Sequence, residues 1–239
     1  MNADADLVKD LAPEGVLRAS LNLGNPVLAQ GTPEAPAGIT ADLARAFAAR
    51  LGVPVEFLCF DAARKSYAAM AEGRADLCFL AVDPAREADV AFTAPYVLIE
   101  GVYAVPREST ARTPADVDTT GTRIGVKEGS AYDLHLTRHL TAATVVRGAE
   151  GVDVFREQGL EAGAGIRQPM TAYAAAHPEV RLVEDAFMQI RQAVGTTVGR
   201  APATVAWLRA TLEELKADGT VRAALLRSGQ SPDLAAPPA

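Results

Sequence analysis

The sequence predicts an α/β protein built from two consecutive units, each a mostly parallel sheet flanked by helices. Strand-like and helix-like segments alternate from residue 16 to residue 82, and a second alternating series begins near residue 122. The chain has 239 residues, of which 49% are hydrophobic, so it can bury a sizeable core.

The first series begins with a strand, VLRASLNL (16–23), and a helix, ITADLARAFAARL (39–51). In the helix Ile39, Leu43, Phe47 and Leu51 recur every four residues and share one face. We expect Thr40 to be its N-cap and Gly52 to follow its C-terminus. The series continues with the strand 53–60, the helix 62–73 and the strand ADLCFLAV (75–82), whose uninterrupted apolar run is typical of a strand covered on both faces.

The second series lies between two further strands, YVLIEGVYAVP (96–106) and QIRQAVGTTV (189–198). Its predicted elements are the strand and helix in TRIGVKEGSAYDLHLTRHL, the strand TVVRG, a helix near 151–158, the run AGAGI, a helix at 169–176 and the strand EVRLVED. A last helix, ATVAWLRATLEELKADG, has Val205, Leu208, Leu212 and Leu215 along one stripe, and Trp207 on it is expected in the core. The tail PDLAAPPA is expected to be extended or disordered.

Charge and composition exclude several classes of protein. The formal net charge is −7 with no block of like charge, so neither nucleic acid nor an anionic membrane surface is an expected partner. No apolar run is long enough for a membrane span, and the start MNADADLVKDLAPEG has no secretory signal pattern.

The usual ligands for metals and cofactors are sparse. Cys59 and Cys78 lie in predicted apolar strands and are expected to be buried, inert thiols. His135 and His139 are four apart in a predicted helix, which is metal-like spacing, but no third ligand accompanies them. Without a Walker loop, dinucleotide fingerprint or zinc signature, the sequence predicts no cofactor and no catalysis.

Three stretches carry a resemblance to a known family. GITADLARAFAARLGVPVEF, EGRADLCFLAVDPAREADVAFTAPY and DVDTTGTRIGVKEGSAYDLHL occur in this order. They resemble the bacterial extracellular solute-binding proteins of the amino-acid type, with the type II periplasmic-binding-protein fold. The resemblance implies two lobes with a ligand cleft between them: residues 1–100 with 192–239, and residues 104–187. It also implies a two-strand hinge, crossing near 99–105 and near 188–194.

Arg86 corresponds to the arginine that holds a ligand carboxylate in this family, six residues before Phe92 of the element FTAPY. A guanidinium suits this role because its rigid fork of donors matches a carboxylate. The alternative is a solvated arginine paired with Asp83 or Glu87. Gly129 and Ser130 stand between a strand and a helix, where they would either receive an anion from the opposite lobe or form a plain serine N-cap.

Other positions depart from the family pattern. Asn25 stands where amino-acid binders commonly have an aromatic residue, and Phe79 and Ala81 replace hydroxyl residues ahead of the arginine; Asn25 and Ala81 are still expected to face the ligand. Arg167, or Gln168, stands where the family often has an aspartate for the ligand's ammonium group. Because Arg167 would repel an ammonium and would repel Arg86 unless an anion lay between them, the sequence favours an amine-lacking or dicarboxylic ligand.

The resemblance implies a monomer that serves the membrane permease of an ABC transporter and works in the periplasm. Since the chain shows no export signal, a cytoplasmic member is the alternative. One enzymatic alternative shares the fold, a dehydratase acting on prephenate or arogenate, for which Glu100 and Glu128 are the candidate acids. A ligand-sensing module of a signalling system is the third possibility.

Overall fold

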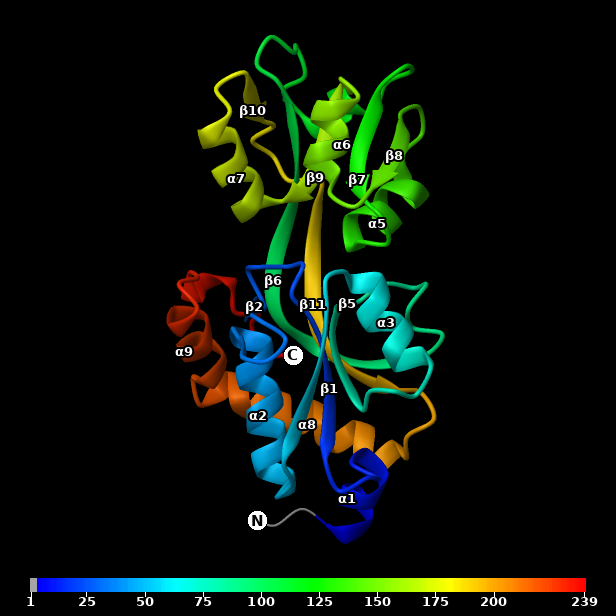
Figure 1. The fold of residues 1–239 in the computed structure, drawn as a ribbon, viewed down its shortest axis with the longest axis vertical. Helices are drawn as coiled ribbons and strands as arrows, with labels where there is room; N and C mark the ends of the chain where they lie inside the picture. Colours follow the sequence, from blue (N-terminus) through cyan, green and yellow to red (C-terminus); the bar gives the residue numbers. More distant parts are fainter. Residues whose placement is uncertain (1–3) are drawn as a thin grey trace. The chain divides into compact units, whose positions relative to one another are not determined.

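The computed structural model describes residues 4–239 and divides them into two compact units. Unit 1 comprises the described residues up to Leu98 together with Arg191–Ala239, and unit 2 is the continuous segment Ile99–Ile190. Two long strands, β6 (Val90–Pro106) and β11 (Met188–Thr197), carry the chain out of unit 1 and back into it. Each unit has its own hydrophobic core, and Figure 1 shows the strands and helices that build it.

In unit 1 the strands follow the order β4-β1-β5-β11. β1 pairs in parallel with β4 and β5, and β11 pairs antiparallel with β5. The helix α2 packs on β1 and β4, α3 packs on β1, β4 and β5, and Figure 1 shows α2 and α3 on opposite sides of β1. The elements up to β5 are α1 (Ala5–Leu11), β1 (Leu17–Asn22), β2 (Gln30–Gly31), β3 (Pro36–Ala37), α2 (Ile39–Leu51), β4 (Val55–Phe60), α3 (Ala63–Ala71) and β5 (Leu77–Ala81). Those after β11 are α8 (Pro202–Ala217), α9 (Thr220–Arg227) and the 3-10 turn η1 (Pro232–Leu234).

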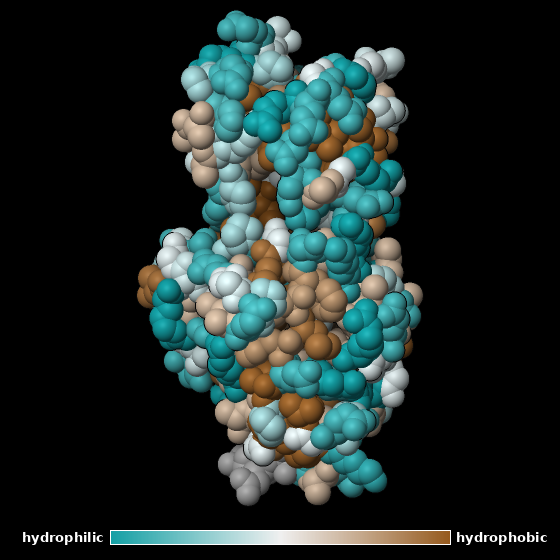
Figure 2. Space-filling model, viewed as in Figure 1, coloured by the Kyte–Doolittle hydropathy of each residue, from teal (hydrophilic) through white to brown (hydrophobic). Residues whose placement is uncertain are grey.

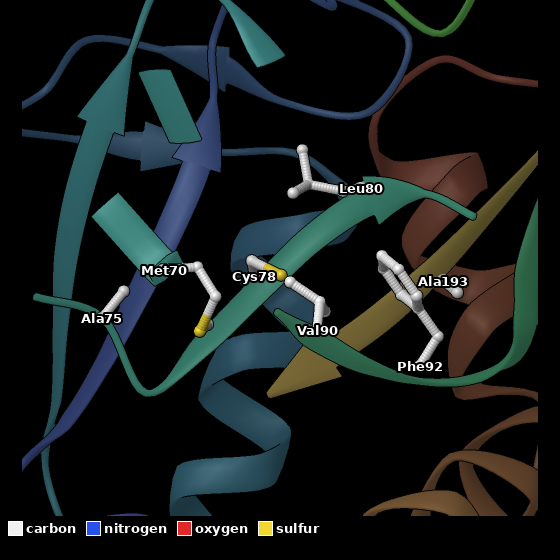
Figure 3. Packing of buried hydrophobic residues seen from close by; sticks show 7 residues of the cluster. All are labelled: Met70, Ala75, Cys78, Leu80, Val90, Phe92 and Ala193. Carbon is white, nitrogen blue, oxygen red and sulfur yellow. The ribbon is translucent and has the colours of Figure 1, made fainter. Parts of the chain in front are cut away.

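The core of unit 1 surrounds β5, all of whose residues are buried, as its uninterrupted apolar run predicts. One cluster joins α3, β5, β6 and β11 through Met70, Ala75, Cys78, Leu80, Val90, Phe92 and Ala193 (Figure 3). Burying both faces of this strand contributes roughly 2 kcal/mol for each large side chain. The end of β5 is therefore a rigid support for the residues that follow it.

In unit 2 the strands follow the order β6-β9-β7-β8, and β10 also pairs with β6. β7 pairs in parallel with β8 and β9, whereas β6 pairs antiparallel with β9 and β10. Phe155 of α6 and Met170 of α7 fill its core with Val102, Ala104, Val154, Leu160 and Val180. Its other elements are α4 (Pro114–Val117), β7 (Arg123–Lys127), α5 (Ala131–His139), β8 (Thr144–Gly148), α6 (Gly151–Glu157), β9 (Ala162–Ile166), α7 (Arg167–Ala176) and β10 (Val180–Leu182).

The structure confirms the α/β class and the predicted order of strands and helices, with four corrections. The N-cap of α2 is Gly38, because the Thr40 hydroxyl donates to the Leu28 carbonyl at 3.1 Å instead of capping the helix. Of the two alternatives for the tail, disorder is wrong: Ala235 forms an antiparallel bridge with Val97, and the N–H of the buried Ala236 donates to the Tyr96 carbonyl at 3.0 Å.

The other two corrections concern side chains that are more exposed than expected. Cys59 is only partly buried, unlike Cys78. Trp207 is half-buried at the rim of the core, where its ring meets Phe47 edge-on at 6.1 Å between centroids. No helix among residues 4–239 combines the length and the apolar character that crossing a bilayer requires.

Candidate ligand-binding site

Arg86 is positioned by a tight turn that follows β5. The Asp83 carbonyl accepts the N–H groups of Arg86 at 2.8 Å and Glu87 at 3.1 Å, and the Asp83 carboxylate accepts the N–H of Ala85 at 2.9 Å. This turn returns the chain toward the strand it has just left. The Arg86 guanidinium consequently donates through Nη1 to the carbonyl of Ala81, the last residue of β5, at 3.0 Å.

The Arg86 side chain is almost fully withdrawn from solvent, with 2% exposure. The positive charge of Arg86 lies near Cys78 and Tyr67. Its own contribution lowers the pKa of both groups, but stronger effects raise both pKa values overall. Burial raises the pKa of the Cys78 thiol to about 12, and the hydrogen bond that the Tyr67 hydroxyl donates to Asp89 raises the pKa of Tyr67. The sequence alternative of a solvated loop arginine is therefore not what the structure shows.

The loop after β1 lies at the same edge of the sheet as Arg86, because β1 and β5 are adjacent and parallel. Asn25 is 5% exposed, and its Oδ1 accepts the N–H of Val27 at 3.3 Å, so its side chain organises this loop. Ala81 is buried opposite Gln192 of β11, also buried, and Gln192 is a polar group that the sequence reasoning missed. Loops at the carboxyl ends of parallel strands are the usual place for a ligand in such sheets.

Phe79, which stands where the family tends to have a hydroxyl residue, supplies no polar group to the site. Its ring is buried and meets Tyr96 edge-on, with 6.1 Å between centroids. The polar groups at this edge of unit 1 include the guanidinium of Arg86, the Asp83 carboxylate that organises its turn, and backbone and amide groups around them. Such a set fits a small anion, above all a carboxylate, which takes the fork of an arginine in bidentate fashion.

In unit 2, Gly129 and Ser130 form the N-terminal cap of α5. The Ser130 hydroxyl accepts the N–H of Asp133 at 3.1 Å, and the Asp133 carboxylate accepts the N–H of Gly129 at 2.9 Å. Gly129 has a φ of 68°, which an L side chain rarely adopts, so the turn favours glycine. The serine-cap alternative thus describes the observed geometry, with Ser130 8% exposed at the end of β7.

Asp133 is the centre of a hydrogen-bond network that the sequence did not reveal. It is 2% exposed and also accepts from Arg147 Nε at 3.0 Å and from the Thr137 hydroxyl at 3.2 Å. The i, i+3 relation to Ser130 was visible in the sequence, but Arg147 reaches Asp133 only because β8 pairs with β7. This network fixes the Gly129–Ser130 turn.

Arg167 is the first residue of α7, and its charge has a partner within unit 2. Its Nε forms an ion pair with the Glu100 carboxylate, and its Nη2 donates to the Glu184 carbonyl at 2.8 Å. The pairing follows from the register of β6 and β9, which places Gly101 opposite Ile166. The electrostatic reason for expecting a second acidic group on the ligand, an uncompensated Arg167, is therefore absent.

Gln168, the alternative to Arg167, has a different environment. Its Oε1 is buried and accepts no hydrogen bond within the described residues. A buried acceptor without a donor is costly, typically by 1–3 kcal/mol, so this amide is suited to receive a donor from outside the protein.

The candidate acids and the candidate metal ligands have different surroundings. Glu100 is bound to Arg167, and Glu128 is an exposed residue at the end of β7. His135 and His139 stack with ring centroids 4.1 Å apart, and His139 Nδ1 lies 2.7 Å from the His135 carbonyl oxygen. Among residues 4–239, no three His, Cys, Asp or Glu side chains are grouped so that they could hold a metal ion.

Comparisons with known proteins bear on the family and the fold. A family model described as bacterial extracellular solute-binding proteins, family 3, matches residues 24–227. No curated protein matches the chain.

Several solved structures are similar over nearly the whole chain. An ancestral amino acid-binding protein, a precursor of cyclohexadienyl dehydratase, is 21% identical with a TM-score of 0.74, covering 94% of this chain and 99% of its own. A binding component of an ABC transporter from Wolinella succinogenes, complexed with lysine, is 17% identical with a TM-score of 0.75, covering 89% and 95%. An amino acid ABC transporter substrate-binding protein from Streptococcus pneumoniae, bound to L-arginine, is 16% identical with a TM-score of 0.75, covering 93% and 97%. At these identities the likeness is one of fold.

Proposed function

The chain belongs to family 3 of the bacterial extracellular solute-binding proteins, and from this premise we propose that it captures a small carboxylate-bearing solute for an ABC-type importer. The observation that carries the proposal is the buried guanidinium of Arg86 at the carboxyl ends of β1 and β5. In this proposal the protein works outside the cytoplasmic membrane as a monomer. It delivers its solute to a membrane permease. These roles are those of the family and of the transporter components that it resembles in fold.

The mechanism we propose is capture by closure of two lobes, which correspond to units 1 and 2. The solute carboxylate binds Arg86 in unit 1 first. Unit 2 then contacts the solute through Ser130 and through Arg167 and Gln168 at the start of α7. Closure is driven only by contacts that form in the closed state, so a solute that touches unit 1 alone leaves the equilibrium unchanged. β6 and β11, the two strands that run between the units, are the proposed hinge.

The class of solute follows from the pairing of Arg167. The sequence favours an amine-lacking or dicarboxylic acid because an unpaired Arg167 would repel an ammonium group. Since Glu100 pairs with Arg167, we propose that the site accepts a free amino acid, as the lysine- and arginine-bound structures of the same fold do. An amine-lacking acid is the competing solute.

A thermal-shift screen separates these two solutes. Purified protein is heated with free amino acids and with amine-lacking mono- and dicarboxylates, each at about 100 times a plausible Kd. Mass action then stabilises the protein by roughly 2.7 kcal/mol, or about 5–10 °C for a chain of this length. A shift with amino acids supports the proposal, and a shift confined to acids without an amine reverses the solute class.

Arg86 is tested by substitution in the presence of the solute that the screen finds. Arg86→Ala is expected to weaken binding by roughly 2–5 kcal/mol, because a buried charge loses its partner. Arg86→Lys keeps the positive charge but not the guanidinium fork, and it replaces the alanine variant in this test if that variant is unstable. The control is Arg74→Ala, an exposed arginine of the same unit that pairs with Glu72. Unchanged affinity, measured by calorimetry in folded Arg86 variants, would remove Arg86 from the site.

The proposed role is binding without turnover. Among the two acids considered for a dehydratase, Glu100 is bound to Arg167 and Glu128 stands exposed at the end of β7. Incubation with prephenate and arogenate is expected to leave both compounds unchanged. Their turnover, with loss of that activity in Glu100→Gln or Glu128→Gln, would establish an enzyme instead.

A further inference from the structure

Two arginines of unit 2 are held side by side by the same two carbonyl oxygens. Arg112 Nη1 donates to the carbonyls of Ser109 at 2.7 Å and Ala111 at 3.1 Å. Arg181 Nη2 donates to the Ser109 carbonyl at 2.8 Å and also to the Ala111 carbonyl. Because both groups bind the same oxygens, their positive charges are fixed close to each other by the loop that follows β6.

Arg107 adds a third positive charge to this end of the unit. Its Nε donates to the Pro178 carbonyl, and its Nη2 lies 3.5 Å from the Val180 carbonyl oxygen of β10, the strand that contains Arg181. Arg107 and Arg112 are exposed, and Arg181 is half-buried. In the part of the chain that the structure describes, these three arginines form no ion pair, and all their side-chain acceptors are neutral carbonyls.

The neighbouring carboxylates compensate this charge only in part. Asp116 Oδ2 accepts the backbone N–H groups of Arg112 and Thr113, each at 2.8 Å, so it is turned to the backbone. Glu108 and Glu179 are exposed and form no ion pair with the three arginines. Burial, followed by the charges of Arg112 and Arg107, lowers the pKa of Arg181. In a protein of net charge −7, this is a local concentration of positive charge.

We propose that the Arg107–Arg112–Arg181 cluster is a binding site for a phosphate-type oxyanion. Guanidinium forks match the oxygens of such a group, and the carbonyls of the loop hold these forks in place before the ligand arrives. Arg112 Nε and Nη2 donate to no protein acceptor among the described residues, so they remain for the oxyanion. The anion offsets the mutual repulsion of the three cations.

The cluster is separate from the proposed solute site. In β6, Gly101 pairs with Ile166 next to Arg167, whereas Pro106 pairs with Val180 at the other end of the strand. The cluster therefore lies at the end of unit 2 remote from Arg167. The end of unit 2 that carries the loop after β6 is largely hydrophilic in the view of Figure 2. The inference does not depend on which solute the protein carries.

The test uses inorganic phosphate with the whole protein. Calorimetry and thermal unfolding are compared in sodium phosphate and in sodium chloride at equal ionic strength. We expect saturable binding of phosphate and a higher Tm in phosphate. Arg112→Gln should weaken binding at least tenfold, because loss of a charge-assisted hydrogen bond of about 1.5 kcal/mol or more corresponds to that factor. Arg107→Gln should weaken it in the same direction.

The matched control is Arg156→Gln, an exposed arginine of α6 in the same unit, whose Nη2 lies 3.7 Å from Asp153. It should bind phosphate like the unchanged protein. Circular dichroism establishes that each variant is folded. The same Tm in phosphate and chloride, or a phosphate affinity of folded Arg112→Gln equal to that of the unchanged protein, would exclude a site for free phosphate. The proposal then stands only if vesicle binding depends on the cluster.

A second arm distinguishes a free oxyanion from a lipid headgroup. Cosedimentation is measured with vesicles of phosphatidylglycerol and of phosphatidylcholine. Binding to phosphatidylglycerol that Arg112→Gln abolishes assigns the site to anionic headgroups, whereas phosphate binding without vesicle binding assigns it to a soluble oxyanion. Absence of both kinds of binding contradicts the proposal.

Discussion

At the scale of single residues, the buried carboxylate of Asp76 is held by two arginines. Arg18 donates to it through Nη2 at 2.8 Å, through Nε at 2.9 Å and through its backbone N–H at 3.0 Å. Arg200 adds a further bond at 2.7 Å. The carboxylate thereby joins the beginning of β1 to the loop that leads into α8.

Asp76→Asn is expected to destabilise the protein by roughly 3–5 kcal/mol, because it leaves the two arginines partly buried without their counter-charge. Urea unfolding monitored by fluorescence measures the loss. Glu72→Gln is the control, because Glu72 pairs with Arg74 at the surface with both side chains more than half exposed. Equal stability of the two variants would show that the Asp76 cluster contributes no more than a surface pair.

Asp118 gives unit 2 a dependence on pH. Its carboxylate accepts the N–H groups of Thr141, Ala142 and Ala143 at 2.8 to 2.9 Å. These bonds, led by that of Ala143, hold the pKa of Asp118 well below its ordinary value of 3.8. Because the folded-state pKa is lowered, the stabilisation is complete above pH 3.8 and is lost as the pH falls below it.

Asp118→Asn should therefore cost on the order of 2 kcal/mol at neutral pH, and the difference from the unchanged protein should shrink between pH 4 and pH 2. Thermal unfolding across this range measures both. Asp153→Asn, which alters an exposed ion pair at 3.7 Å, should show no comparable change. A difference that stays constant with pH would mean that the Asp118 charge is not the cause.

At the scale of elements, unit 2 depends on close contact between β7 and α6. A side chain on Gly125 would place its Cβ 2.4 Å from the Gly151 carbonyl oxygen, and one on Gly151 would meet the Ala164 carbonyl oxygen at 2.8 Å. These glycines let the first turn of α6 lie directly on the sheet. The strand and helix would have to separate to admit even a methyl group.

Gly125→Ala is accordingly expected to cost about 1–3 kcal/mol, as overpacking does, or more because the contact is with backbone. Differential scanning calorimetry gives the change in Tm. Gly199→Ala is the control, since its Cβ would meet only one atom, at 3.8 Å. A Gly125→Ala variant as stable as the control would mean that α6 is free to shift on the sheet.

What the sequence could predict depends on whether a contact is local or distant in the chain. Periodicity located the main strands and helices, because the apolar faces of α2, β5 and α8 are visible as local patterns. Contacts distant in the chain were not visible: Arg167 meets Glu100 67 residues away only through the pairing of β6 with β9. By composition the tail is expected to be extended or disordered, and it is ordered through contacts with the distant strand β6, where Ala235 bridges Val97 and Ala236 donates to the Tyr96 carbonyl.

Arg86 shows the limit at the candidate site. Its place six residues before Phe92, read through the resemblance to the family, singled it out, but did not show that it is buried. Burial results from the turn at Asp83, which directs the side chain back to Ala81. The cap at Ser130 was predictable because its partner, Asp133, is three residues away.

At the scale of the whole molecule, the proposed capture mechanism predicts a change in dimensions. A solute that contacts both units should decrease the radius of gyration measured by small-angle X-ray scattering, because it stabilises the closed form. Folded Arg86→Ala should show no decrease at the same solute concentration, and Arg74→Ala should behave like the unchanged protein. A bound solute that leaves the radius unchanged would contradict closure.

Unit 1 is made from two separated parts of the chain, and unit 2 from one continuous part. During synthesis on the ribosome, β1, β4 and β5 emerge first, but residues 192–195 of β11, which pair with β5, emerge only after all of unit 2. Ala193, which is buried in the core of unit 1, and the helix α8 also emerge after Ile190, the last residue of unit 2. The unit that begins the chain is thus the last that can be completed, and unit 2 is the part whose full sequence is available first.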